Sequence, residues 1–125
     1  PKYGAPAHAM EHTLELIDMA KRQGVDVAFD VIPHNWNHTR VRAILPKWAL
    51  EGGPEAIVKR LRDPKMRSLI RKNRQPMWLL VRDAKWSEIV LLDADVNKDL
   101  IGASFEEIGH IKGVDPYDAV FDLLF

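Results

Sequence analysis

Residues 7 to 33 read AHAMEHTLELIDMAKRQGVDVAFDVIP, and this stretch joins a helical pattern to a strand pattern through a single glycine. Apolar side chains recur at helical spacing from residue 7 to residue 23, Pro6 suits the first turn, and Gly24 suits the left-handed stop. Residues 25–32 are rich in β-branched side chains and end at Pro33, which predicts a strand. A helix, a one-residue turn and an apolar strand form half of a βαβ unit. We therefore expect an α/β fold in which the strand is buried in a parallel sheet.

The rest of the chain predicts mostly helices. Ser104 with Glu107 forms a capping box, and the pairs Asp63-Pro64 and Asp115-Pro116 each supply an N-cap and a first-turn proline. The predicted elements are a helical, basic stretch at 40–74, a short strand at 78–81, a strand at 89–94, and helices at 104–112 and 116–124. Two or three strands make a poor sheet, so the sequence predicts one part of a larger α/β fold.

Length and composition restrict the class of protein. A chain of 125 residues, 46% of them apolar, is enough for a single domain with one core. Eighteen Lys and Arg balance eighteen Asp and Glu, so no overall field attracts nucleic acid or an anionic membrane, and neither partner is expected. The absence of cysteine excludes disulfides and thiolate chemistry. We expect a soluble, cytoplasmic protein, and the start at Pro1 is what a processed chain or a piece of a longer one would show.

The segment HAMEH, residues 8 to 12, matches H-x-x-E-H, a pattern in which two histidines hold zinc and the glutamate activates water. On a helical wheel, however, His8 and His12 lie at the flank of the apolar face and Glu11 lies almost opposite it. Three fixed positions in five residues also arise easily by chance. We therefore interpret the segment as an exposed helix start, and expect no metal ligand within it.

A second histidine pair, His34 and His38, follows the predicted strand in the segment HNWNH. Loops at the carboxyl ends of strands carry ligands and catalytic groups in α/β folds, so this position favours substrate contact. The alternative is a polar loop whose side chains satisfy nearby backbone groups. We take His34, His38 and Arg40 as the candidate substrate-binding residues and name no catalytic residue.

Two further features have structural explanations. The eleven Lys and Arg of residues 40–74 are interrupted by Glu51, Glu55 and Asp63, so we interpret the stretch as a solvated helical surface and not as a nucleic-acid face. The four tryptophans are more often core or interface residues than a ligand pocket.

Four segments in order carry a resemblance to a known family. They are DVIPHNWNHTRVRAILPKWALEGG at 30–53, RLRDPKMRSLI at 60–70, WSEIVL at 86–91 and LIGASFEEIGHIKGVDPYDAVFDLLF at 100–125. Together they resemble the later part of the N-acyl-D-amino-acid deacylases, or D-aminoacylases, of the amidohydrolase superfamily. The family shows L-P-x-W-A-x-E-G-G, W-x-x-I-x-L and a closing S-x-x-E-I, D-P-x-D-A and D-L-L. The match at LPKWALEGG is the most specific of these.

The resemblance implies a (β/α)8 barrel, or TIM barrel, with zinc at its mouth, where metal-activated hydroxide attacks an amide carbonyl. The family's metal ligands and its proton-shuttling aspartate would all lie outside residues 1–125. The chain is therefore expected to be a partial barrel segment that is inactive alone. Its partners would be the remainder of the barrel and a small-molecule amide substrate.

One departure from the family pattern leaves the substrate open. The family's Tyr-Pro-Tyr, which shapes the substrate pocket, is Ile32-Pro33-His34 in this sequence, so an amide other than an N-acyl-D-amino acid remains an alternative. The competing hypothesis is a free-standing interaction module without catalytic activity. If the segment is isolated, the uncovered edges of the strand at 25–32 predict self-association.

Overall fold

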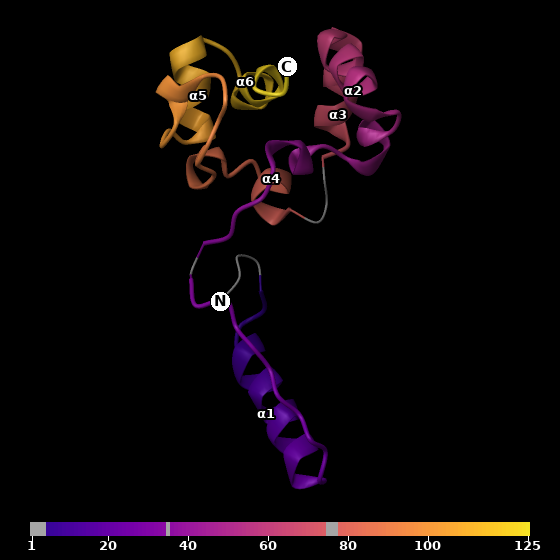
Figure 1. Ribbon diagram of the computed structural model, residues 1–125, viewed down its shortest axis with the longest axis vertical. Helices are drawn as coiled ribbons and strands as arrows, with labels where there is room; N and C mark the ends of the chain where they lie inside the picture. The colour runs from indigo at the N-terminus through magenta and orange to yellow at the C-terminus, as the bar shows by residue number, and fades with distance from the viewer. Residues whose placement is uncertain (1–4, 35, 75–77) are drawn as a thin grey trace. The chain divides into compact units, whose positions relative to one another are not determined.

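The structure is a computed structural model that describes residues 5–34, 36–74 and 78–125 (Figure 1). The chain divides into two compact units, an amino-terminal unit, Pro1–Asn37, and a carboxy-terminal unit, His38–Phe125.

The amino-terminal unit contains one helix, α1, at Ala9–Arg22. Glu11 lies in its first turn and Lys21 and Arg22 in its last, which is the favourable arrangement for the helix dipole. The chain leaves α1 through Gly24, whose φ of 82° is the left-handed conformation that glycine adopts without strain. The helix predicted at 7–23 is confirmed, with its first turn starting at residue 9.

Residues 25–32 form no strand in this structure, contrary to the prediction from their β-branched side chains. The Val25 N–H donates to the Ala20 carbonyl at 3.0 Å, and the following segment runs back along α1 (Figure 1). A strand requires a neighbour to accept its ladder of hydrogen bonds, and the described residues supply none here. The apolar pattern is therefore present without the sheet that it requires.

The carboxy-terminal unit is a series of short helices. They are η1 (Val41–Ile44), η2 (Lys47–Leu50), α2 (Gly53–Arg62), α3 (Pro64–Lys72), α4 (Leu79–Arg82), η3 (Trp86–Glu88), η4 (Lys98–Leu100), α5 (Phe105–Lys112) and α6 (Pro116–Asp122). The helical stretch predicted at 40–74 is confirmed as two 3-10 and two α-helices. The helices predicted at 104–112 and 116–124 are confirmed as α5 and α6, with α6 ending two residues earlier.

The two other predicted strands are corrected. Within 78–81, residues 79 to 81 open the short helix α4. The strand predicted at 89–94 is reduced to one antiparallel bridge, which pairs Val90 with Ser104. An apolar run of four residues does not distinguish a strand from a buried helical turn, because in both states its side chains are covered.

The helix caps predicted from sequence are confirmed. The Lys65 N–H donates to Asp63 Oδ1 at 2.8 Å, and the Tyr117 N–H donates to Asp115 Oδ1 at 2.9 Å. At α5 the capping box is complete, since the Glu107 N–H donates to Ser104 Oγ and the Ser104 N–H donates to Glu107 Oε2. These bonds satisfy amide groups that the first turn of a helix leaves without partners.

One hydrophobic core lies within the carboxy-terminal unit, where α5 packs on α6 and α2 packs on α3. Tyr117 is central to it, with its ring centroid 5.0 Å from that of Trp86 and 4.6 Å from that of Phe121. The buried apolar residues are Ile44, Leu45, Ala49, Leu61, Ile70, Val81, Trp86, Leu91, Leu100, Phe105, Ile108, Tyr117, Ala119, Val120 and Phe121. Since they come from every part of residues 44–121, packing joins the short helices into one body.

The described chain is thus mostly helical, as expected for this segment, and nearly without strands. None of the helices in the described ranges has both the length and the apolar character needed to cross a membrane.

Candidate functional site

The predicted site residue His34 lies in the amino-terminal unit, in the loop after the extended segment. Its imidazole stacks on the indole of Trp36, with ring centroids 5.1 Å apart and planes inclined by 19°. Both side chains are exposed, and the indole is 55% accessible. The stack presents one flat, partly apolar surface beside an imidazole that is able to donate a hydrogen bond.

The other two predicted site residues, His38 and Arg40, begin the carboxy-terminal unit. Both are exposed. Arg40 is the N-cap residue of η1, where its carbonyl accepts a hydrogen bond from the Ala43 N–H at 2.9 Å. The backbone at Arg40 is therefore held by the start of a helical turn, while its guanidinium faces solvent.

The HAMEH segment forms the start of α1. His8 is the N-cap residue in a left-handed conformation, and its Nδ1 is 3.8 Å from Glu11 Oε1 in an exposed pair. No three His, Asp or Glu side chains in the described ranges are grouped in a way that would hold a metal ion. The residues present therefore do not fit a zinc site, because such a site requires at least three protein ligands converging on one point.

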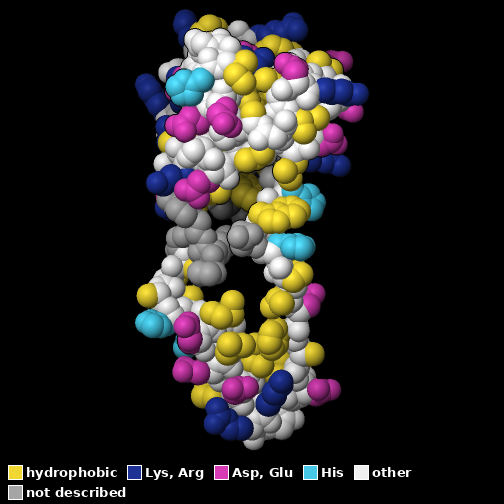
Figure 2. Space-filling view, turned by 90° about the vertical axis from the view of Figure 1, so that its left-hand side faces the viewer, with side chains coloured by type: hydrophobic (Ala, Val, Ile, Leu, Met, Phe, Trp, Pro, Cys, Tyr) yellow, Lys and Arg dark blue, Asp and Glu magenta, His cyan; other side chains and the backbone are white. Residues whose placement is uncertain are grey.

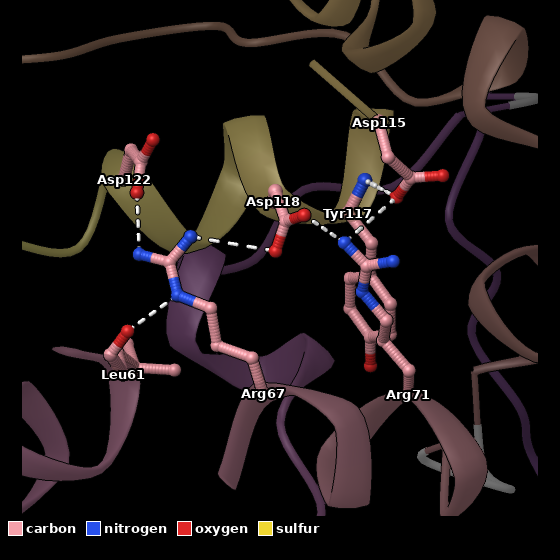
Figure 3. Close-up of polar contacts among 7 residues, drawn as sticks. All are labelled: Leu61, Arg67, Arg71, Asp115, Tyr117, Asp118 and Asp122. Atoms are coloured by element: carbon pink, nitrogen blue, oxygen red, sulfur yellow. Dashed lines mark hydrogen bonds and ion pairs between the residues drawn. The ribbon is translucent and has the colours of Figure 1, made fainter. Parts of the chain in front are cut away.

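The most developed polar cluster joins α3 to α6 and is called the Arg–Asp clasp (Figure 3). Arg67 Nη1 is 3.3 Å from Asp118 Oδ1 and its Nη2 is 2.5 Å from Asp122 Oδ1. Arg71 Nη2 contacts Asp118 Oδ2 and lies 3.5 Å from Asp115 Oδ1. Asp118 thus receives both guanidinium groups. These pairs connect residues that are about fifty positions apart in the sequence and hold the last helix against α3.

The clasp is a structural contact and not an anion site. It borders an open hollow of about 410 Å³ that Arg62, Arg67 and Arg71 line together with Asp118. The aspartates already balance the charge of the two clasp arginines, so an incoming anion would have to displace a carboxylate. Arg67 also donates from Nε to the Leu61 carbonyl, and its guanidinium lies 5.5 Å from the Phe121 ring centroid.

Other cations of the basic stretch are also used within the chain. Arg60 Nη1 donates to the Ala49 carbonyl at 3.1 Å and to the Glu51 carbonyl at 2.5 Å. Arg74 Nη1 donates to the Arg82 carbonyl at 3.1 Å. These hydrogen bonds support the prediction of a helical surface with a structural role, because several of its arginines donate to backbone carbonyls of the same chain.

The segment LPKWALEGG has a specific structure within the carboxy-terminal unit. Leu45 and Ala49 are buried at 0% and 1% exposure, and Pro46 is also buried. Gly52 and Gly53 have φ of 82° and 81°, and a Cβ on Gly52 would lie 3.0 Å from the Ala56 Cβ. The Arg60 guanidinium stabilises this turn, because it donates hydrogen bonds to the carbonyls of Ala49 and Glu51. The leucine, proline and alanine of this segment are buried as apolar residues usually are, and its two glycines have the left-handed φ that glycine adopts without strain.

Comparison of the chain with family models, with curated protein sequences and with solved structures gave no match.

Sequence reasoning missed both Trp36 as the partner of His34 and the Arg–Asp clasp. A signal for the first was present, since the two rings are separated by one residue in the sequence. The second had no local signal, because Arg67 and Asp118 are distant in the sequence and only the packing of α6 on α3 brings them together.

Proposed function

We propose that this chain is a segment of a zinc-dependent amidohydrolase of the D-aminoacylase type, which hydrolyses the amide bond of an N-acyl-D-amino acid or a related amide. The proposal rests on the resemblance at LPKWALEGG, and the structure of that segment is the observation that supports it. In that segment the leucine and the alanine lie in the core and both glycines have positive φ, so its apolar and glycine positions have defined structural roles.

In this proposal the chain supplies no metal ligand, and the zinc is held by parts of the enzyme outside residues 1–125. The carboxy-terminal unit is a helical cover, stiffened by its core and by the Arg–Asp clasp. His34 in the amino-terminal unit, and His38 and Arg40 at the start of the carboxy-terminal unit, are each proposed to contact the substrate. A neutral imidazole and a guanidinium donate hydrogen bonds, so these side chains suit the carboxylate or the carbonyl of an acylated amino acid.

The test compares the natural protein that contains these residues with the 125-residue chain. Each is assayed for hydrolysis of N-acetyl-D-amino acids and of their L-enantiomers, before and after a zinc chelator. We expect D-selective, chelator-sensitive hydrolysis by the longer protein and none by the chain. Hydrolysis by the 125-residue chain that follows added zinc would contradict the proposal. Absence of amide hydrolysis from both proteins would favour the interaction module.

A matched pair of variants tests the proposed contact of His34 with the substrate. In the longer protein, His34→Ala should lower kcat/KM for the D-substrate by roughly tenfold, the effect of losing one hydrogen bond to substrate. His12→Ala removes a comparable exposed histidine from α1 and should leave kcat/KM unchanged. If the two substitutions change kcat/KM equally, His34 does not contact the substrate.

A further inference from the structure

Residues 89–92 form an extended edge beside residues 102–105 in the carboxy-terminal unit. The Phe105 N–H donates to the Ile89 carbonyl at 2.8 Å, the Leu91 N–H to the Ala103 carbonyl at 3.0 Å, and the Gly102 N–H to the Leu91 carbonyl at 2.8 Å. With the Val90–Ser104 bridge, these bonds give two short antiparallel segments. The inner side of residues 89–92 is therefore paired.

The outer side of the same edge offers its backbone to a partner. In extended backbone, alternate residues direct their N–H and C=O groups to opposite sides. Leu91 uses its N–H and C=O toward residues 102–105, and Ile89 uses its C=O there while its N–H donates to the Trp86 carbonyl at 3.4 Å. The groups of Val90 and Leu92 therefore point to the other side, and within the described ranges neither of these two residues has a backbone hydrogen bond. The side chains alternate as well, since Leu91 is buried at 4% exposure while Val90 and Leu92 are 43% and 57% exposed. An edge with free amides and outward apolar side chains is a template for an added strand.

The surroundings of this edge indicate the chemistry of the partner. Val96 and Ile101 add apolar surface at 74% and 42% exposure. Three exposed aspartates, with Lys98 as the basic residue among them, follow this edge in the sequence: Asp93, Asp95 and Asp99. On the face of the carboxy-terminal unit that Figure 2 presents, apolar and acidic side chains lie next to one another. A second copy of this chain would bring its own three aspartates against these, which is unfavourable.

We propose that residues 89–92 are a docking site for an extended peptide that adds as a β-strand and that carries alternating apolar residues with Lys or Arg at its ends. The main chain of the peptide bonds to the N–H and C=O groups of Val90 and Leu92. Its apolar side chains cover Val90 and Leu92, and its cations meet Asp93 and Asp95. This site shares no residue with the candidate substrate-binding residues His34, His38 and Arg40.

The probe is a capped seven-residue peptide in which valine and threonine alternate between two terminal lysines. A second peptide has glutamates in place of the lysines. Binding to the 125-residue chain is measured by titration calorimetry, and by NMR shifts of the backbone amides. We expect the lysine peptide to bind roughly tenfold more tightly than the glutamate peptide at low salt, with the difference falling as salt rises. The amide shifts should be largest at Val90 and Leu92.

Two substitutions complete the test. Leu92→Pro removes an N–H that has no partner within the chain, so the fold should persist while peptide binding falls at least fivefold, by roughly the value of one hydrogen bond. Leu92→Thr keeps the N–H and the β propensity and should retain binding. The proposal is overturned if Leu92→Pro and Leu92→Thr bind equally, if both peptides bind equally, or if neither binds. It is also overturned if light scattering shows a dimer that Leu92→Pro dissociates, since the occupant is then a second copy.

Discussion

At the scale of the residue, Tyr117 lies in an environment that strongly perturbs its hydroxyl. It is 2% exposed, it is in contact with Trp86 and Phe121, and its hydroxyl lies 3.5 Å from the Ile44 carbonyl. Burial raises the pKa of Tyr117 from 10.0 to about 12, because the phenolate is poorly solvated in the core. The positive charges of Arg74 and Arg71 act in the opposite direction without cancelling this effect.

The raised pKa of Tyr117 makes the free energy of unfolding depend on pH in the alkaline range. Between pH 10 and 12 the folded chain holds the phenolic proton more tightly than the unfolded chain, so the free energy of unfolding falls as the pH rises through this window. The loss is on the order of 2 to 3 kcal/mol for a shift of two units. Urea unfolding followed by tryptophan fluorescence at pH 9 and pH 12 measures it. Tyr117→Phe should remove most of this pH dependence, and an unchanged profile in the variant would assign it to other groups.

At the scale of the element, the capping box fixes where α5 begins. Hydrogen bonds from the backbone N–H and the hydroxyl of Ser104 lower the pKa of Glu107, because they stabilise its carboxylate. A lowered folded pKa contributes stability that is present above the unfolded pKa and is lost as the pH falls through the folded one. Ser104→Ala removes the hydroxyl, so the pKa of Glu107 should rise toward its ordinary value. A side-chain NMR titration measures the shift, with Ser87→Ala, at an exposed serine, as the control.

The Arg–Asp clasp stabilises the contact between two elements, α3 and α6. Asp118→Asn removes the carboxylate that receives both Arg67 and Arg71, and leaves two partly buried guanidinium groups with weaker acceptors. We expect the free energy of unfolding to fall by about 1 to 2 kcal/mol, between the values for exposed and fully buried pairs.

Urea unfolding with Asp99→Asn as a matched control checks this expectation. Asp99 is exposed and outside the clasp, so its substitution should change stability little. The difference between the variants should shrink in high salt, because ions screen partly exposed pairs. Equal stability of both variants would mean that apolar packing alone holds α6 on α3.

At the scale of the whole molecule, the two units differ in how much apolar surface they bury. The amino-terminal unit has no buried residue among those described, and Leu16, Phe29 and Ile32 are 48%, 54% and 68% exposed. A helix of 14 residues without a packed face is marginal in water. The carboxy-terminal unit has a core of its own.

Limited proteolysis should therefore separate the units. Trypsin is expected to cut first at Lys21 and Arg22 and to leave residues 38–125 intact for longer, because cleavage requires local unfolding and α1 opens at little cost. Mass spectrometry of the early fragments reads out the order. Chymotrypsin should give the same order with a first cut at Phe29. Early cleavage within α2 to α6 by either protease would contradict the difference in stability between the units.

Local chemistry accounts for most of what was predicted correctly. The N-caps at Asp63, Ser104 and Asp115 and the left-handed stop at Gly24 each depend on hydrogen bonds or φ values within a few residues, so the sequence contains their whole cause. The helical character of 40–74 has the same origin in propensity and periodicity. The candidate residues His34, His38 and Arg40 were chosen by position after a predicted strand, and they stay a prediction.

Partners distant in the sequence explain the rest. Residues 25–32 have the composition of a buried strand, yet a strand exists only where neighbours accept its hydrogen bonds, and composition cannot supply them. Residues 79–81 are covered equally well as a helical turn, so the core around Val81 selects the helix. The Arg–Asp clasp and the burial of Tyr117 depend on the docking of α6. Short-range rules therefore set the ends of the helices, whereas long-range packing sets which charges and apolar faces find a partner.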